Sequence, residues 1–204
     1  PETDMPLLPK GFLLLDSGAQ YSDGTTDITR TIQLGPVSDE QRRVYTLVLK
    51  GHLSLQNLCF PRGASGTQLD AVARTAMWRE GMNFMHGTGH GVGSYLSVHE
   101  GPHQIRQEYR PAPMLEGMTV TDEPGLYLEG KFGVRIENTL LTVPYITTEF
   151  GRFLRFEPLT LCPIDTAPIV KEMLSAEETA CLNAYHEMVY DRLAPHLDEE
   201  HRTW

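Results

Sequence analysis

Five residues of this sequence stand out as candidates for binding metal ions or moving protons: Asp16, Asp27, His90, Glu123 and Glu137. Glu123 and Glu137 stand at the two ends of an expected β-hairpin, in which two apolar runs flank a Gly-Lys-Phe-Gly turn. A carboxylate at the end of an apolar strand is unfavourable unless it is paired or binds a cation. The spacing therefore suggests a cation shared by these two glutamates.

A second expected hairpin offers a second pair of carboxylates, Asp16 and Asp27, one from each strand. The apolar run 11–15 predicts a buried strand that ends on Asp16, and the β-branched residues of segment 25–32 predict the returning strand. An aspartate among β-branched neighbours opposes local propensity, and such conflicts are typical of functional sites. The alternative is structural: Asp16 would stabilise a turn, and the other carboxylates would be solvated surface groups.

Three histidines, His86, His90 and His99, lie in or just after a glycine-rich segment, residues 86–93 (HGTGHGVG). Its alternating glycines allow the backbone to approach another group closely or to adopt positive φ. Imidazole can bind a metal, transfer protons or hold a substrate carbonyl. The segment is similar to a phosphate-binding loop, but it lacks the lysine and the following helix of that motif.

Four carboxylates and one imidazole would make a poor structural zinc site, because such sites prefer cysteine and histidine. The set suits two hard divalent cations with bridging carboxylates, and its oxygen-rich chemistry favours Mn²⁺ or Mg²⁺. Two such cations lower the pKa of a bound water and polarise a carbonyl, which is the chemistry of metal-assisted hydrolysis. Because the carboxylates repel one another, we expect all of them to ionise only with the cations bound.

The composition is that of an ordinary soluble globular protein and narrows the classes of partner. The chain has 204 residues, of which 40% are hydrophobic and 22% charged, which is enough for one substantial core. A net charge of −10 without a run of Lys or Arg argues against a nucleic-acid partner. We also expect no membrane partner, because no apolar stretch approaches the length of a membrane span. Three widely spaced cysteines form no zinc or disulfide pattern, which fits a reducing cytoplasm.

Local signals predict the scaffold around these residues. Capping boxes at Ser38 and Ser175 predict helices that run to about residues 58 and 193. A further helix is expected from about residue 68 to residue 80, ended by Gly81. Strands are expected over 140–145 and 153–161. We expect the helix that begins at Ser38 and the helix over residues 68–80 to cover a curved sheet.

Five motifs in this order resemble the catalytic domain of the aminopeptidase P (Xaa-Pro aminopeptidase) family of pita-bread metallopeptidases. They are residues 16–31 (DSGAQYSDGTTDITRT), 86–93 (HGTGHGVG), 98–102 (VHEGP), 121–127 (TDEPGLY) and 133–138 (GVRIEN). The eukaryotic-type cytosolic branch is the most similar, also through residues 156–164 (FEPLTLCPI). The resemblance covers nearly the whole chain. It implies an α+β pita-bread fold, a curved and mostly antiparallel sheet covered by helices.

The resemblance also implies a role for each residue of the set. Asp16 and Asp27 would bind one metal and His90 and Glu123 the other, while Asp27 and Glu137 would bridge the two. Glu123 would also handle the proton of the water between the metals.

Four further residues receive roles in the same way. His86 and His99 match the histidines that contact substrate and shuttle protons. Arg135 would orient Asp27 or a neighbouring ligand, and Tyr127 would approach the site.

The implied activity is hydrolysis of the bond between an N-terminal residue and a following proline, through a hydroxide bridged by two divalent metals. Mn²⁺ is the expected metal, with Zn²⁺, Co²⁺ and Mg²⁺ as alternatives. The implied substrates are peptides with proline in the second position, the implied location is the cytoplasm, and the implied assembly is a homodimer. Two alternatives remain open: a prolidase, which uses the same ligands on dipeptides, and a non-catalytic peptide-binding module.

The family domain begins further upstream than this chain. Residues 1–204 are therefore expected to form a single catalytic domain that is incomplete at its N-terminus. The absent part would include the first half of the sheet and a further active-site histidine. We expect exposed apolar surface as a consequence, unless a second chain covers it.

Overall fold

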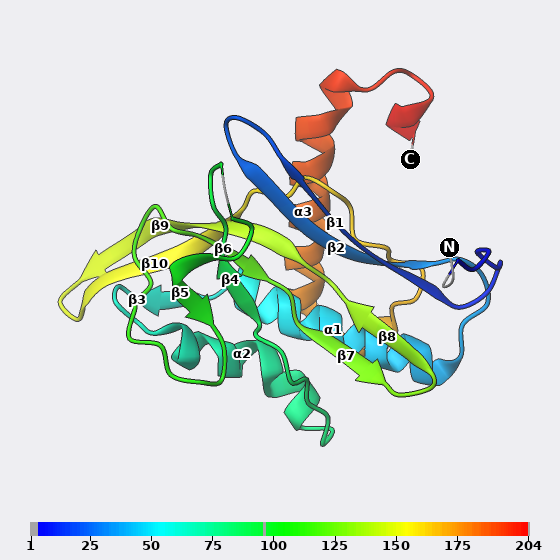
Figure 1. The fold of residues 1–204 in the computed structure, drawn as a ribbon, viewed down its shortest axis with the longest axis horizontal. Helices are drawn as coiled ribbons and strands as arrows, with labels where there is room; N and C mark the ends of the chain where they lie inside the picture. The colour runs from blue at the N-terminus through cyan, green and yellow to red at the C-terminus, as the bar shows by residue number, and fades with distance from the viewer. Residues whose placement is uncertain (1–3, 96, 204) are drawn as a thin grey trace.

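Helices packed on antiparallel strands make up the computed structural model, which describes residues 4–95 and 97–203 (Figure 1). The three α-helices are α1 (Asp39–Gln56), α2 (Gly66–Trp78) and α3 (Ala176–Leu193). The strands are β1 (Phe12–Gln20), β2 (Thr25–Gln33), β3 (Cys59–Pro61), β4 (Gly89–Gly91), β5 (Glu100–Ile105), β6 (Thr119–Asp122), β7 (Gly125–Leu128), β8 (Phe132–Arg135), β9 (Asn138–Thr148) and β10 (Gly151–Pro158). The paired strands are antiparallel, which confirms the predicted α+β class.

The strands form one sheet of six, in the order β3-β10-β9-β6-β4-β5, and two pairs, β1-β2 and β7-β8. Strand β6 leads into β7, and β8 leads into β9, so the β6–β9 and β7–β8 ladders form one long, bent hairpin. Its last pair before the bend is Asp122 with Asn138, and its first pair after the bend is Gly125 with Arg135. The hairpin predicted from the sequence is therefore confirmed, and Glu123 and Glu137 lie at the bend between the two ladders.

Strand β1 is longer than the apolar run predicted. It does not end on Asp16 but continues to Gln20, with Asp16 opposite Thr29 and Gly18 opposite Asp27. The small residues after Asp16 accommodate the ladder, because pairing with β2 outweighs their low strand propensity. In this register Asp16 and Asp27 become diagonal neighbours on one face.

The burial predicted for the run 11–15 is only partly found, since Leu15 is 50% exposed. The reason is that β1 pairs with β2 alone among the described residues. Met5, Leu7 and Tyr21, from the segments on either side of β1, are also exposed. Exposed apolar surface was expected from the resemblance.

The capping boxes predicted at Ser38 and Ser175 are both present and begin α1 and α3. A third box, at Ser65 with Gln68, was not recognised in the sequence and begins α2 two residues earlier than predicted. Gly81 follows that helix with φ of +71°, as expected for a residue that ends a helix. Strand β10 ends at Pro158, before the predicted residue 161, although the next residue, Leu159, still donates to the carbonyl of Thr139 on β9.

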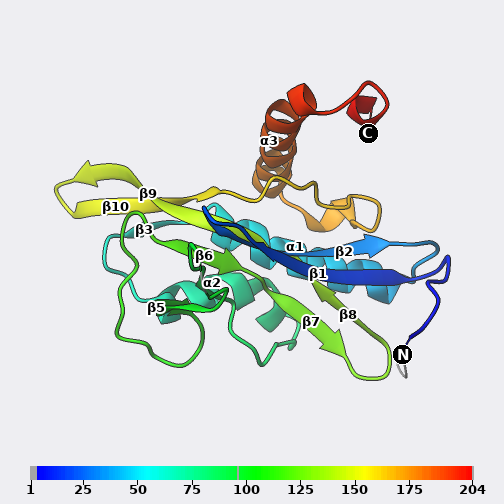
Figure 2. The ribbon, with the colours of Figure 1, turned by 45° about the horizontal axis from the view of Figure 1, so that its top comes forward.

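Two apolar cores stabilise the fold, and α1 contributes to both. The first core packs Val48 of α1 against Val134 of β8 and Leu182 of α3. The second packs Leu55 of α1 against residues of α2 and of the six-stranded sheet. Figures 1 and 2 show α1 behind the strands, with α3 crossing it and extending beyond them. The site residues lie on the strands and on the segments that join them.

Candidate metal centre

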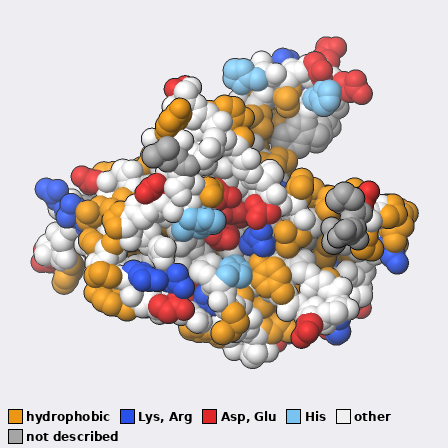
Figure 3. Space-filling view, viewed as in Figure 1, with side chains coloured by type: hydrophobic (Ala, Val, Ile, Leu, Met, Phe, Trp, Pro, Cys, Tyr) orange, Lys and Arg blue, Asp and Glu red, His pale blue; other side chains and the backbone are white. Residues whose placement is uncertain are grey.

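Side chains from three separate elements meet at the bend of the long hairpin. Asp27 of β2, His90 of β4 and Glu137 offer metal-binding atoms that all lie within 4.8 Å of one another. Glu123 joins them, with its Oε1 3.3 Å from His90 Nε2, and Asp27 Oδ2 lies 3.4 Å from the same nitrogen. Figure 3 shows this acidic cluster, flanked by histidines, at the centre of one face of the molecule. The structure therefore brings together four of the five residues singled out in the sequence.

Backbone hydrogen bonds bring these elements together. The amide of Glu137 donates to the carbonyl of Thr29 on β2 at 3.1 Å, and the amide of Glu123 donates to the carbonyl of Thr88 at 2.8 Å. The bent hairpin is thus hydrogen-bonded on one side to the strand that carries Asp27 and on the other side to the residue that precedes β4, the strand that carries His90.

Asp16 lies at the edge of the group. Its side chain is 53% exposed, and its Oδ2 accepts a hydrogen bond at 2.6 Å from Nη2 of Arg135. Arg135 was predicted to orient Asp27 or a neighbouring ligand, and the carboxylate that it contacts is that of Asp16. Its diagonal position relative to Asp27 still allows both aspartates to face one cation.

The charges of the cluster shift the pKa values of two members. Burial, together with the negative charges of Glu123 and Asp27, raises the pKa of Glu137 to about 8. Burial alone would lower the pKa of His90, but its hydrogen bonds with Asp27 and Glu123 outweigh burial and raise that pKa to about 10. In metal-free protein at neutral pH the cluster therefore holds protons that a cation would displace.

Hydrogen bonds orient the side chains that would bind metal. Nδ1–H of His90 donates to the carbonyl of Gly91 at 2.9 Å, which leaves Nε2 to face the carboxylates. The hydroxyl of Thr121 donates to Oε1 of Glu123 at 3.1 Å, and the hydroxyl of Thr29 donates to Oε2 of Glu137 at 2.6 Å. This oxygen-rich set with one oriented imidazole fits hard divalent cations.

A chain of hydrogen bonds forms one wall of the site. Nη1 of Arg135 donates to the Tyr127 hydroxyl at 3.0 Å, and that hydroxyl donates to Nε2 of His86 at 2.9 Å. Nδ1–H of His86 donates in turn to the carbonyl of Gly87 at 2.7 Å, and burial lowers the pKa of His86, so this imidazole is neutral. The ring of His99 packs edge-on against that of His90, with centroids 4.3 Å apart.

Two adjoining cavities open onto these residues. One, of about 560 Å³, is lined by His86, His90, His99, Glu123, Tyr127 and Arg135 among others. The other, of about 380 Å³, is lined by Asp16, Asp27 and His99 among others. His99 lines both cavities, and every candidate residue named from the sequence except the buried Glu137 lines one of the two. Each cavity is of a size suited to a small ligand.

The sequence pattern of metallopeptidase family M24 matches residues 1–144, and that of the C-terminal region of this peptidase family matches residues 152–204. The chain belongs to metallopeptidase family M24. It is 48% identical to aminopeptidase P1 of Lotus japonicus over 97% of this chain and 30% of that protein. It is 44% identical to Xaa-Pro aminopeptidase 1 of Dictyostelium discoideum over 97% of this chain and 32% of that protein.

Solved structures confirm the pita-bread fold expected from the resemblance. The X-prolyl aminopeptidase of Caenorhabditis elegans, described as a cytosolic enzyme with a dinuclear active site, superposes with a TM-score of 0.87 and 44% identity over 93% of this chain and 31% of that one. Prolidase from Pyrococcus furiosus superposes with a TM-score of 0.60 and 34% identity over 71% of this chain and 40% of that one. The chain thus spans about a third of the length of its aminopeptidase relatives.

Behind the M24 site lies a buried arginine that the sequence analysis did not single out. Arg30 is 6% exposed, and no carboxylate lies within ion-pair distance of it among the described residues. It donates instead to the carbonyl of Glu137 at 2.6 Å, to Oδ1 of Asn138 at 2.8 Å and to the hydroxyl of Tyr185 at 3.0 Å. The carbonyls of Cys162 and Pro163 accept from it as well, at 2.6 and 2.9 Å.

One guanidinium therefore ties the segment that carries Glu137 to α3 and to the chain that precedes it. The sequence feature that could have indicated a buried Arg30 is its position between Ile28 and Ile32, on the face of β2 opposite Asp27. An arginine on an apolar strand face needs buried partners.

A second buried cluster, based on α2, holds the loop that carries His86. Arg74 is 1% exposed, pairs with Asp70 at 2.6 Å, and donates to the carbonyl of His86 at 2.9 Å. The other oxygen of Asp70 accepts from the hydroxyl of Thr88 at 2.5 Å. This buried, fully hydrogen-bonded pair stabilises the backbone of His86 and Thr88, next to the histidines of the site.

Gly89 explains part of the glycine-rich pattern. A Cβ atom at this position would overlap the carbonyl oxygen of Thr121 on the neighbouring β6. Close approach of two strands, rather than positive φ, is thus the reason for glycine here.

Proposed function

We propose that this chain carries the catalytic centre of a metal-dependent aminopeptidase that removes an N-terminal residue preceding proline. The observation that carries the proposal is the meeting of Asp27, His90, Glu123 and Glu137 in one acidic centre. That centre stands in a sequence 44% identical to an X-prolyl aminopeptidase with a dinuclear active site. At this level of identity, shared site chemistry supports shared activity, which fold alone would not.

The proposal includes two divalent cations. Asp16 and Asp27 would hold one cation, His90 and Glu123 would hold the other, and Asp27 and Glu137 would bridge them. The oxygen-rich ligands favour Mn²⁺, with Zn²⁺, Co²⁺ and Mg²⁺ as alternatives. When bound, the cations would lower the pKa of a water and polarise the scissile carbonyl.

The residues of the chain supply the proton transfers and the orientation. Glu123 would accept the proton of the attacking water on Oε2, because its Oε1 already accepts from Thr121. His99 is the proposed donor to the oxyanion that develops on the substrate carbonyl, since its ring lines both cavities. Nε2 of His86 accepts a hydrogen bond from the Tyr127 hydroxyl. His86 and this hydroxyl would therefore contact the substrate together.

The proposed substrates are peptides with proline in the second position, the proposed location is the cytoplasm, and the proposed assembly is a homodimer. A helix long and apolar enough to cross a membrane does not occur within the described part of the chain. The alternative activity is that of a prolidase. The prolidase from Pyrococcus furiosus superposes less well, with a TM-score of 0.60 against 0.87 for the X-prolyl aminopeptidase.

The test is Mn²⁺-dependent release of arginine from the tripeptide Arg-Pro-Pro by the intact protein, compared with the dipeptide Arg-Pro. Cleavage of the tripeptide supports the aminopeptidase, and cleavage of the dipeptide alone would indicate a prolidase. Asp27→Ala and Glu137→Ala should each abolish metal-dependent turnover, and full activity in either variant would overturn the ligand assignment. A calorimetric titration without any divalent-metal binding would indicate the non-catalytic peptide-binding module.

A further inference from the structure

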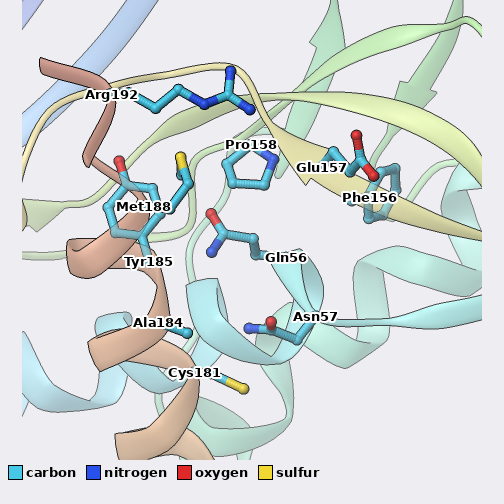
Figure 4. Close-up of a pocket in the computed structure, with 10 residues that line it drawn as sticks. All are labelled: Gln56, Asn57, Phe156, Glu157, Pro158, Cys181, Ala184, Tyr185, Met188 and Arg192. Atoms are coloured by element: carbon cyan, nitrogen blue, oxygen red, sulfur yellow. The ribbon is translucent and has the colours of Figure 1, made fainter. Parts of the chain in front are cut away.

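A separate cavity of about 340 Å³ lies between the end of α1, strand β10 and helix α3 (Figure 4). It shares no lining residue with the two cavities at the metal centre. Its volume falls within the usual range for small-molecule sites. Figure 4 shows side chains of α3 and β10 on opposite sides of the space, with the amide of Gln56 between them.

The inner wall of this cavity offers a hydrogen-bond donor without a protein acceptor. Arg30 can only donate, so the Asn138 oxygen faces it and the Asn138 Nδ2 must donate elsewhere. That nitrogen donates to Oε1 of Gln56 at 2.7 Å, which turns the Gln56 Nε2 toward the cavity. Gln56 is 4% exposed, and within the described chain its Nε2 has no acceptor. Gln56 Nε2 is not among the enclosed polar atoms that lack a partner, so it is open to the cavity and can donate to a ligand that carries an acceptor.

The mouth of the cavity offers an acceptor and a cation. Asn57 donates through Nδ2 to the carbonyl of Leu53 at 2.8 Å, so its Oδ1 is left to accept. Arg192, on the last turn of α3, is exposed, and no carboxylate pairs with it in the described residues. The one carboxylate of the lining, Glu157, is already paired with Arg155 at 2.9 Å. The charge that remains at the mouth is therefore positive.

Apolar side chains supply the rest of the lining. Phe156 and Pro158 of β10 lie on one side, and Met188 of α3 lies on the other (Figure 4). A ligand that matches this lining has a carbonyl that accepts from Gln56, an N–H that donates to Asn57 and an apolar body. It also carries a negative charge that pairs with Arg192.

We propose that this cavity is a second binding site, for a small N-acylated amino acid with an apolar side chain. Its acyl carbonyl accepts from Gln56, its amide N–H donates to Asn57, and its carboxylate binds Arg192. Its side chain lies against Met188 and Phe156. Gln56 accepts a hydrogen bond from Asn138, which follows Glu137 in the chain. A ligand bound to Gln56 is therefore linked through Asn138 to the hydrogen bonds behind the metal centre.

The experiment uses intact protein labelled with ¹³C in the methionine methyl groups, and Met188→Leu identifies the Met188 signal. N-acetyl-L-leucine is the charged probe, and N-acetyl-L-leucinamide is the neutral one. We expect saturable shifts of the Met188 signal with a Kd of about 1 mM for the acid, and about tenfold weaker binding of the amide. Met85 is 88% exposed and lines none of the cavities described here, so its signal provides the internal reference.

Two variants separate the contacts. Arg192→Gln should weaken binding of the acid about tenfold without weakening that of the amide, so that the preference for charge disappears. Gln56→Leu should weaken both probes equally. Arg43→Gln, which removes the same charge from the exposed pair with Glu80, should bind the acid like the wild type.

Several outcomes would overturn the proposal. They are a Met188 signal unchanged at about 10 mM acid, equal binding of acid and amide by the wild type, or an Arg192→Gln variant that retains the preference for charge. A Met188 signal that responds to protein concentration instead of to the acid would assign this face to contact between copies of the chain. Arg192 is exposed, so the Arg192→Gln variant should fold. This variant decides the test even if Gln56→Leu does not fold.

Discussion

Replacing Arg30 with methionine should both destabilise the protein and weaken metal binding. Methionine retains most of the apolar stem, so the change removes the guanidinium and little else. Four acceptors then lose the hydrogen bond from Arg30: the carbonyls of Glu137, Cys162 and Pro163 and the Asn138 side chain.

The expected magnitude follows from these contacts. A buried acceptor left without its donor loses about 1–3 kcal/mol of stability. The four effects are not additive, because the Tyr185 hydroxyl can still donate to one of these acceptors: it lies 2.8 Å from the carbonyl oxygen of Cys162 and 3.2 Å from Asn138 Oδ1. We therefore expect the free energy of unfolding to fall by about 3–5 kcal/mol. Metal affinity should fall about tenfold, because the segment that carries Glu137 loses its anchor.

Urea denaturation followed by circular dichroism measures the first effect, and calorimetric titration with Mn²⁺ measures the second. The matched control is Arg43→Met, in which an arginine pairs with Glu80 on the surface, where its side chain is 49% exposed. Exposed pairs contribute about 0–1 kcal/mol, so the control should be nearly as stable as the wild type. An Arg30→Met protein within about 0.5 kcal/mol of that control, with unchanged Mn²⁺ affinity, would refute the reasoning.

Three further changes test the metal centre by the same titration. Thr29→Val removes the hydroxyl that donates to Glu137, and we expect about tenfold weaker metal binding. Gly89→Ala places a methyl group against a backbone carbonyl of β6, so the adjacent His90 should move and metal binding should be lost. Affinity should rise as the pH increases toward about 8, because the raised pKa of Glu137 keeps that carboxyl protonated below this value and the cation must displace the proton. Titrations in buffers of different ionisation enthalpy measure the proton released.

Each of these changes has its own control. Thr29→Ser keeps the hydroxyl and should restore most of the affinity, and a serine variant as weak as the valine variant would contradict the assigned hydrogen bond. Gly87→Ala places its Cβ 3.6 Å from Arg106, an ordinary contact, and should bind metal normally. An affinity that does not change between about pH 6 and pH 8 would contradict the shifted pKa of Glu137.

The residue types of the site and the elements nearest to them follow from the sequence. The hairpin between Glu123 and Glu137 and the capping boxes at Ser38 and Ser175 are local, because each depends on residues within one turn or one strand pair. Strand alternation also placed Asp27 and Thr29 on one face of β2. For these features, neighbours in the chain are neighbours in space.

Tertiary structure decided the rest. Sequence patterns cannot show that Arg30 meets Tyr185, because 155 residues separate them and only the packing of α3 brings them together. The same applies to Asp16, which pairs with Arg135 across 119 residues and therefore lies at the edge of the cluster. A buried polar group takes its partners from whichever segments the apolar cores bring alongside it. Those partners, and the pKa values that depend on them, exist only once the chain has folded.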